Sequence, residues 1–198
     1  MGVSEYIKIE KKIKNGCYNN IMSSNDILEE LIIYGNKNIH KAGVSNKHYC
    51  VIFQERKKCS KILCYGMNHI RNGKTIHAEV DAINNLPPSS KRNRLMKVSL
   101  MVIRINKHNK ICNSRCCVKC CESIYSIPSY RGYVIDQIYY SNEEGEIEYS
   151  HPISLLLNVN VHKSSYFKKK NYKPRLPDKI KSSPTLSERY YVERLNSI

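Results

Sequence analysis

Apolar side chains recur at helical spacing in two segments of the chain. In the first segment, residues 25–34, the apolar positions are Ile27, Leu28, Leu31 and Ile32. They follow the i, i+1, i+4, i+5 spacing of an amphipathic helix, which Ser and Asn side chains at 23–25 can cap and Gly35 is expected to end. The second segment, residues 75–86, has the same periodicity and stops at Pro87-Pro88. We predict a helix in each segment.

Shorter apolar runs predict the strands. Runs at 49–53 and 61–65 are separated by charged residues, which is the pattern of a β-hairpin. Two further runs, at 97–105 and 133–140, are bounded by charged or polar residues and predict buried strands. A short helix, a turn and an edge strand complete the predicted core, at residues 122–127, 142–145 and 146–149.

These elements alternate along the chain as hairpin, helix, strand, helix and strand. A polar loop through Asn72-Gly73 is expected between the hairpin and the helix at 75–86. Strands that are separated by helices of roughly ten residues need crossover connections, which place helices over the faces of a sheet. The predicted fold class is therefore α/β with three layers.

Three regions are expected along the 198 residues. Residues 1–39 form an N-terminal extension with one short helix, and residues 40–162 form the folded domain. Residues 163–198 are a basic tail with ten Lys or Arg against three Asp or Glu. Such a tail buries little apolar surface by itself, so we expect it to be extended or draped over the domain, with one possible helix at 186–195.

The formal charge of +16 and the pI near 9.4 make an anionic partner such as nucleic acid physically plausible. Lys168-Lys169-Lys170 in the tail are candidates for phosphate contacts. An equally good interpretation is a solvated basic surface, because Lys, Asn, Ile and Tyr are all abundant here, as AT-rich coding produces. The charge alone leaves both interpretations open.

The chain has no stretch of about 18 uninterrupted apolar residues that would span a membrane, and its N-terminus has no apolar signal region. We therefore expect an intracellular location, in the cytoplasm or the nucleus, or incorporation into a virus particle. The nine cysteines then lie in a reducing compartment. Closely spaced cysteines are under those conditions more often metal ligands than disulfides.

The candidate chemistry lies in His77, Glu79, Cys117 and Cys120. One imidazole and a C-x-x-C pair make three zinc ligands, and three protein ligands leave the fourth position open for water, as in hydrolytic zinc sites. His77 and Glu79 are two positions apart, which is about 200° around an α-helix. They can face a common site only at the N-terminal end of a helix, so we predict that the helix begins at His77.

Cys117 and Cys120 are one turn apart at the start of another predicted helix. A helix N-terminus lowers the pKa of a thiol and favours the thiolate that binds metal. Two helix N-termini that meet at one zinc ion would complete the ligand set. Glu79 is then placed to accept and deliver protons.

This pattern, H-x-E followed by C-x-x-C, resembles the cytidine and deoxycytidylate deaminase superfamily. Three further stretches carry the resemblance, which covers about residues 40–150. Gly66-Met67-Asn68 is similar to the G-x-N that precedes the H-A-E of many members. Residues 113–120 resemble the S-K-P-C-x-x-C variant of deaminase-like proteins in some eukaryotes and large DNA viruses, and Tyr140-Ser141 through Ile147 is similar to the stretch that follows there.

The resemblance implies a three-layer α/β/α fold with a central mixed sheet of about five strands and a Zn²⁺ cofactor. It implies hydrolytic deamination of a cytosine base to uracil, in a free nucleoside, a deoxynucleotide or a polynucleotide. His77, Cys117 and Cys120 would bind the metal and Glu79 would transfer protons. Asn68 would contact the sugar of the substrate and Ala78 would help to bind it. The resemblance also implies a homo-oligomer.

One position departs from the family pattern, because Cys116 replaces the proline that usually precedes the first cysteine ligand. Its thiol could compete for the metal. The alternative hypothesis is therefore a non-catalytic, zinc-stabilised protein with a structural, virion-associated or nucleic-acid-binding role. Tyr125 and Tyr130 are candidates for stacking on a base, although most of the 15 tyrosines must belong to the core or the surface.

Overall fold

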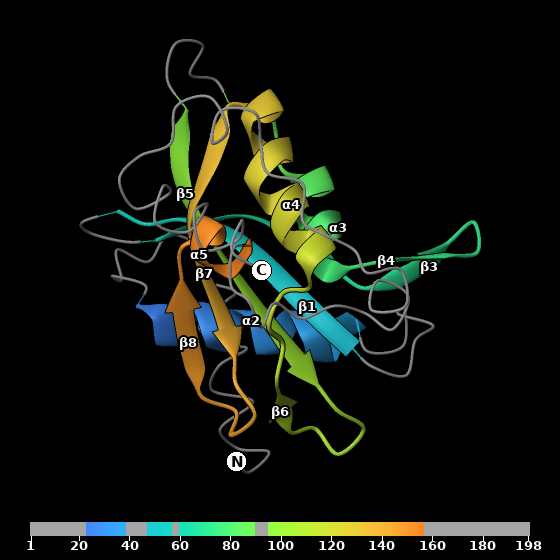
Figure 1. Cartoon of the computed structure of the whole chain (residues 1–198). Helices are drawn as coiled ribbons and strands as arrows, with labels where there is room; N and C mark the ends of the chain where they lie inside the picture. The colour runs from blue at the N-terminus through green and yellow to red at the C-terminus, as the bar shows by residue number, and fades with distance from the viewer. Residues whose placement is uncertain (1–22, 39–46, 57–59, 90–94, 157–198) are drawn as a thin grey trace, which may run out of the picture.

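The computed structural model describes residues 23–38, 47–56, 60–89 and 95–156 (Figure 1). Residues 1–22, the tail 163–198 with its predicted helix at 186–195, and Lys168-Lys169-Lys170 lie outside these ranges. The boundaries expected at 39/40 and 162/163 also lie outside them, and the three-region division stays a prediction. In the described part of the chain, no helix is long and apolar enough to cross a membrane.

The centre of the protein is a six-stranded mixed sheet of order β2-β1-β5-β7-β8, with the short β6 paired to β5. β5 and β7 run parallel, and the other neighbouring pairs are antiparallel. The strands are β1 Lys47–Gln54, β2 Lys61–Met67, β5 Met96–Ile105, β6 Ile111–Cys112, β7 Tyr133–Ser141 and β8 Ile147–Ser150. The predicted hairpin, both buried strands and the edge strand are therefore confirmed.

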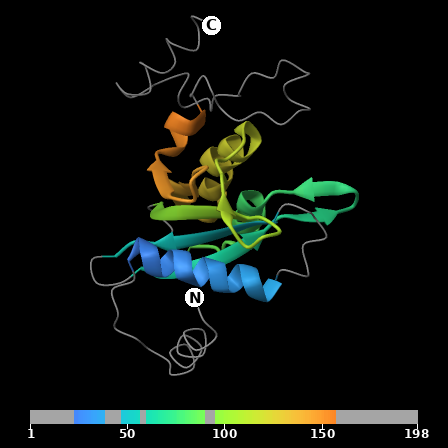
Figure 2. The same ribbon diagram turned by 90° about the horizontal axis from the view of Figure 1, so that it is seen from below.

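Helices cover the two faces of this sheet, as Figure 2 shows. One face packs against α2, and the other packs against α3, α4 and α5. The helical segments are α2 Ser24–Asn38, α3 Ala78–Asn85, α4 Val118–Ser126, the 3-10 helix η1 Ile127–Arg131 and α5 Pro152–Leu156. The α/β class with three layers is therefore confirmed.

Alternation along β5 divides the interior into two cores. Leu100 and Val102 belong to the cluster under α3 and α4, whereas Met101 and Ile103 belong to the cluster under α2. Successive side chains of a strand point to opposite faces, so the sequence of a strand that is buried on both faces is a continuous apolar run. This explains why residues 97–105 show no alternation of polar and apolar positions.

The prediction that Gly35 ends the first helix is wrong, because α2 continues to Asn38. Gly35 lies over the ring of Tyr49, where an added Cβ would approach the ring carbons to 2.8 Å. The glycine therefore allows α2 to lie close to β1 and is not a stop signal. The N-terminal end agrees with the predicted cap, since Ser23 and Asp26 exchange side-chain to backbone hydrogen bonds of 2.6 and 3.3 Å.

The expected polar loop after the first hairpin is instead a second hairpin, formed by β3 His69–Arg71 and β4 Lys74–Ile76. Its two-residue turn is Asn72-Gly73, and both residues have positive φ, 51° and 71°. Asn-Gly is the preferred sequence of such a type I′ turn. The hairpin projects from the body of the molecule and leads directly into His77 and α3 (Figure 1).

Helix α3 packs directly on the backbone of β2 at Gly66. A Cβ at this position would collide with the backbone of Ala78 and Ala82. Two α3 side chains also bind the β2 backbone: Asp81 Oδ2 accepts from the Met67 N–H at 3.0 Å, and Asn85 Nδ2 donates to the Tyr65 carbonyl at 3.0 Å. The position of α3, and with it that of His77, depends on the absence of a side chain at Gly66.

We therefore expect Gly66→Ala to destabilise the protein by about 3 kcal/mol, the upper end for overpacking, because the collision is with backbone and not with a flexible side chain. Gly73→Ala is the matched control. It has open space around it and only the positive φ to oppose, which costs about 1 kcal/mol. Urea unfolding of both variants measures the difference, and a loss for Gly66→Ala no larger than that for Gly73→Ala would contradict the packing argument.

Candidate metal centre

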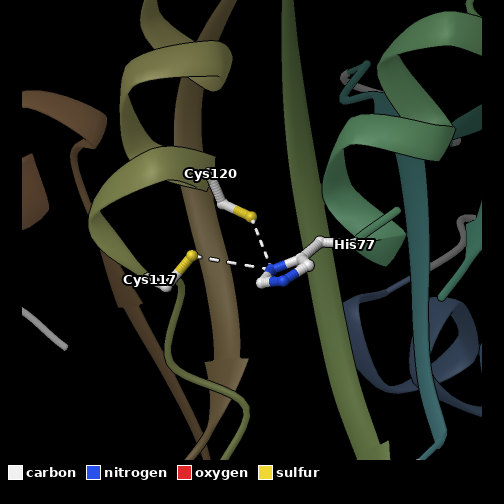
Figure 3. A group of neighbouring side chains, drawn as sticks. All are labelled: His77, Cys117 and Cys120. Carbon is white, nitrogen blue, oxygen red and sulfur yellow. Dashed lines mark hydrogen bonds between the residues drawn. The ribbon is translucent and has the colours of Figure 1, made fainter. Parts of the chain in front are cut away.

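The two helix N-termini that carry the predicted ligands face each other (Figure 3). His77 is the N-cap of α3 and has extended backbone angles, φ −80° and ψ 151°. Cys117 immediately precedes α4, and Cys120 lies in the first turn of α4. The prediction that the helix begins at His77 is confirmed, and so is the placement of the C-x-x-C at a second helix start.

The three candidate ligand atoms all lie within 4.8 Å of one another. Both sulfur atoms converge on the same ring nitrogen: His77 Nδ1 is 3.5 Å from Cys117 Sγ and 3.2 Å from Cys120 Sγ. Tetrahedral zinc, with Zn–S near 2.3 Å and Zn–N near 2.0 Å, separates such donor atoms by about 3.5 Å. The donor set therefore fits a zinc ion in both chemistry and spacing.

The protonation of the two thiols is asymmetric. The pKa of Cys117 is lowered from 9.0 to about 4, chiefly by a hydrogen bond from the Cys120 thiol and further by His77. Burial acts in the opposite direction. The same hydrogen bond, together with burial, raises the pKa of Cys120 well above its usual value. The pair thus holds one thiolate that is ready to bind metal and one proton that a bound cation would displace. The pKa of His77 is raised, chiefly by its hydrogen bond with Cys117.

Glu79 lies in the first turn of α3 and is only 5% exposed. Burial is the main cause that raises the pKa of its carboxyl group, and the charge of Cys117 acts in the same direction. Hydrogen bonds from the backbone and from the Cys116 thiol, together with the charge of His77, partly oppose this shift. A buried carboxyl group with a raised pKa is suited to transferring protons near neutral pH.

A pocket of about 610 Å³ opens beside these groups, which is a typical size for a small-molecule site. His77, Ala78, Glu79 and Cys117 line it together with Asn68. The remaining lining residues are His48, Thr75, Arg104, Asn113, Ser114, Arg115 and Glu143. The structure thus brings Asn68 and Ala78, the two predicted substrate-contacting residues, to the same pocket as the candidate ligands.

Asn68 also has a structural role. Its side-chain Oδ1 accepts a hydrogen bond of 2.8 Å from the His48 N–H, and its own N–H donates to the His48 carbonyl at 3.1 Å. It is 7% exposed. These bonds attach the residue after β2 to the start of β1, and they fix the orientation of the Asn68 amide at the pocket wall.

Two buried serines, Ser114 and Ser141, hold the segment before Cys117 in place. No role for either serine is predicted from the sequence. Ser114 Oγ donates to the Val102 carbonyl of β5 at 2.7 Å and accepts from the Ser141 N–H of β7 at 2.8 Å. Ser141 Oγ donates to the Cys112 carbonyl at 2.6 Å. Both serines lie in the stretches that carry the family resemblance, so their positions were visible in the sequence although their contacts were not.

The other candidates from the sequence lie apart from the ligand atoms. Cys116 is 1% exposed, and burial raises the pKa of its thiol well above the usual value, so it is a neutral group beside Glu79. Tyr130 is 88% exposed, and Tyr125 packs against the core. Neither tyrosine is among the described residues that line the pocket. The contacts of this structure therefore do not support a base-stacking role for them.

No protein-family model matches the chain, and neither does any curated protein. Among solved structures, it is similar to a cytidine deaminase from Burkholderia pseudomallei, with 13% identity, a TM-score of 0.43, and coverage of 71% of this chain and 100% of that one. It is also similar to the dCMP deaminase of the cyanophage S-TIM5 in its apo form, with 17% identity, a TM-score of 0.39, and coverage of 71% and 97%. Because these sequence identities are low, the chemistry of the site is inferred from the side chains that line the pocket.

We expect Glu79→Gln to stabilise the metal-free protein at pH 7. Because burial raises the folded-state pKa of Glu79 above 4.5, its ionised form costs folding free energy at higher pH, and Gln keeps the shape without the charge. Below about pH 4.5 the carboxyl group is protonated in both the folded and unfolded states, so the advantage of the variant should disappear. Urea midpoints between about pH 4 and pH 8 measure this dependence.

The exposed variant Glu144→Gln serves as the control for loss of a carboxylate, with an expected change within about 0.5 kcal/mol. A Glu79→Gln midpoint at or below that of the unsubstituted protein at pH 7 would contradict the cost assigned to the buried charge.

Proposed function

We propose that the protein is a zinc-dependent hydrolase of the cytidine deaminase-like superfamily, of the S-K-P-C-x-x-C type, and converts a cytosine base to uracil with release of ammonia. The observation that carries this proposal is the convergence of His77 Nδ1 and the two thiols of Cys117 and Cys120 beside the buried carboxyl group of Glu79. Three ligands with an adjacent acid/base and an open pocket are the arrangement of a hydrolytic zinc site.

Zinc, when bound by these three residues, supplies a Lewis acid that lowers the pKa of a water molecule toward about 7. Glu79 would accept one proton from that water as the C4–O bond forms and would pass it to the ring nitrogen N3. It would then take the proton of the new C4 hydroxyl group and deliver it to the amino group, so that the C4–N bond breaks, C4 becomes a carbonyl and ammonia leaves. The raised pKa of Glu79 supports this role, because the group must hold a proton during one step and release it in the next.

Asn68 and Ala78 would position the substrate. Asn68 has one amide oxygen committed to the His48 N–H, so its Nδ2 group is the donor that would reach a sugar hydroxyl. Ala78 is fully buried between His77 and Glu79 and lines the pocket with them. Its small side chain leaves room for the flat base next to the reacting carboxyl group.

A second candidate function is a non-catalytic, zinc-stabilised protein with a structural, virion-associated or nucleic-acid-binding role. One observation favours it: the usual proline is replaced by Cys116, whose buried thiol acts on the pKa of the buried Glu79 carboxyl group in the direction opposite to burial. It thereby partly offsets the raised pKa that the reaction needs. A homo-oligomer, an intracellular location and a polyanion partner for the basic tail also stay predictions.

Glu79→Gln is expected to lower the rate of ammonia release from cytidine, dCMP or a cytosine-containing oligonucleotide by about 10²- to 10⁴-fold, the usual contribution of a general acid/base. Zinc content should remain near one ion per chain, since Gln leaves the three ligands intact. The contrasting variant Cys117→Ser should lose zinc and activity together. Absence of ammonia release by the unsubstituted zinc-loaded protein from all three substrates would reject the proposed reaction.

Asn68→Asp separates the substrate contact of Asn68 from its structural role. Asp keeps an oxygen that accepts from the His48 N–H but removes the Nδ2 donor. We expect KM to rise about 10-fold, the effect of one lost neutral hydrogen bond. Because the position is only 7% exposed, the new carboxylate also lowers thermal stability at neutral pH, and this loss should disappear at a pH low enough to protonate it. Asn68→Ala, which also removes the acceptor, should lose both affinity and stability. Equal KM values for Asn68→Asp and the unsubstituted protein would exclude a contact through Nδ2.

A further inference from the structure

The pocket carries positive side chains that the proposed reaction does not use. Among the described residues that line it, two are arginines: Arg104 near the end of β5, and Arg115 in the segment before α4. Both side chains are partly buried. Neither can donate a proton during catalysis, because an arginine side chain keeps its charge at all relevant pH values. A guanidinium group at a pocket wall can instead bind an anionic or polar group.

Strand register fixes the face on which Arg104 lies. Leu100 and Val102 belong to the core under α3 and α4, and Arg104 continues the same alternation. His48 lies directly opposite Arg104 on β1, and it also lines the pocket. The cationic side chain thus emerges on the same sheet face as the candidate metal centre, at the carboxyl end of β5, where α/β proteins commonly bind ligands.

Arg115 lines the pocket from a different segment, two residues before Cys117. Its segment is anchored: the Arg115 N–H donates to Asn113 Oδ1 at 2.9 Å, and the neighbouring Ser114 is bound to β5 and β7. A guanidinium group on an anchored segment loses less conformational entropy on binding than one on a free loop.

We propose that Arg104 and Arg115 bind the phosphate of a phosphorylated cytosine substrate, so that the pocket takes a nucleotide or a nucleic-acid strand in preference to a bare nucleoside. This inference rests on the proposed function. The planar guanidinium matches phosphate oxygens in two parallel hydrogen bonds, and a phosphate is the anionic group that a cytosine substrate can offer. One exposed carboxylate, that of Glu143, also lines the pocket and opposes this preference.

Equilibrium binding tests the proposal without depending on turnover. Zinc-loaded Glu79→Gln protein is titrated with dCMP and with deoxycytidine, and dCMP is expected to bind at least about 10-fold more tightly. Adding Arg104→Gln or Arg115→Gln should weaken dCMP binding by about 10- to 100-fold, the effect of one lost charged hydrogen bond. Arg115→Lys should restore part of that loss, because it keeps the charge without the planar fork.

Lys97→Gln is the matched control, since it removes one positive charge from the same strand at an exposed position paired with Asp136. It should leave the affinity for both compounds unchanged. Glu143→Gln removes the opposing charge and should strengthen dCMP binding. Equal affinities for dCMP and deoxycytidine, absence of dCMP binding, or a parallel loss of both compounds in the arginine variants would overturn the phosphate subsite.

A third titration separates the two sources of phosphate. A single-stranded oligonucleotide with one cytosine is compared with dCMP at several salt concentrations. The β3–β4 hairpin beside the pocket carries Arg71 and Lys74 next to its turn, both exposed. If the double variant Arg71→Gln, Lys74→Gln weakens the oligonucleotide alone and lowers its salt dependence, the source is a strand; if it affects neither ligand, the source is the free nucleotide. Either result supports a phosphate subsite.

The phosphate subsite and the proposed reaction can fail separately. Arginine-dependent dCMP binding without ammonia release from any substrate would keep the subsite and reject the deaminase. Conversely, ammonia release from deoxycytidine and dCMP with equal kcat/KM, unchanged by Arg104→Gln or Arg115→Gln, would keep the deaminase and reject the subsite.

Discussion

The contact between α3 and the backbone of β2 at Gly66 is the constraint on which the candidate site depends. Because there is no side chain at this position, the first turn of α3 lies against the strand, and Asp81 and Asn85 bind the β2 backbone on either side of the contact. The position of His77 and Glu79 relative to the sheet is therefore set by this packing. A residue of any larger size at Gly66 would push α3 away from the strand and so disturb the position of His77 relative to Cys117 and Cys120.

The second half of the site is held by a different kind of interaction. Where α3 is positioned by close packing, the segment that leads into α4 is positioned by buried hydrogen bonds among Ser114, Ser141 and the backbone of β5. Such networks are rigid when all members are satisfied. The two parts of the candidate metal centre thus meet on one face of the sheet, each fixed by contacts among protein groups.

The electrostatics of the pocket follow from this arrangement. Burial makes the carboxyl group of Glu79 harder to ionise, while the hydrogen bond between the two ligand thiols makes Cys117 easier to ionise. These opposite shifts suit the separate roles that we propose for the two groups, proton transfer for Glu79 and metal binding for Cys117. The arginines at the pocket wall add positive charge at a second place, which is where we propose that the phosphate of a substrate binds.

Most of the fold and the residues of the candidate site could be predicted from the sequence. Apolar spacing located α2 and α3, apolar runs located the strands, and the angle between positions i and i+2 required His77 and Glu79 to stand at a helix start. The roles of Gly35 and of the serine pair are not visible in the sequence, and Asn72-Gly73, where a polar loop is expected, forms the turn of a second hairpin. Only the folded chain shows these features and brings Arg104 and Arg115 to the wall of one pocket. The physical reason is that each depends on contacts between segments distant in the chain, such as the ring of Tyr49 under Gly35, which no local pattern of polar and apolar residues records.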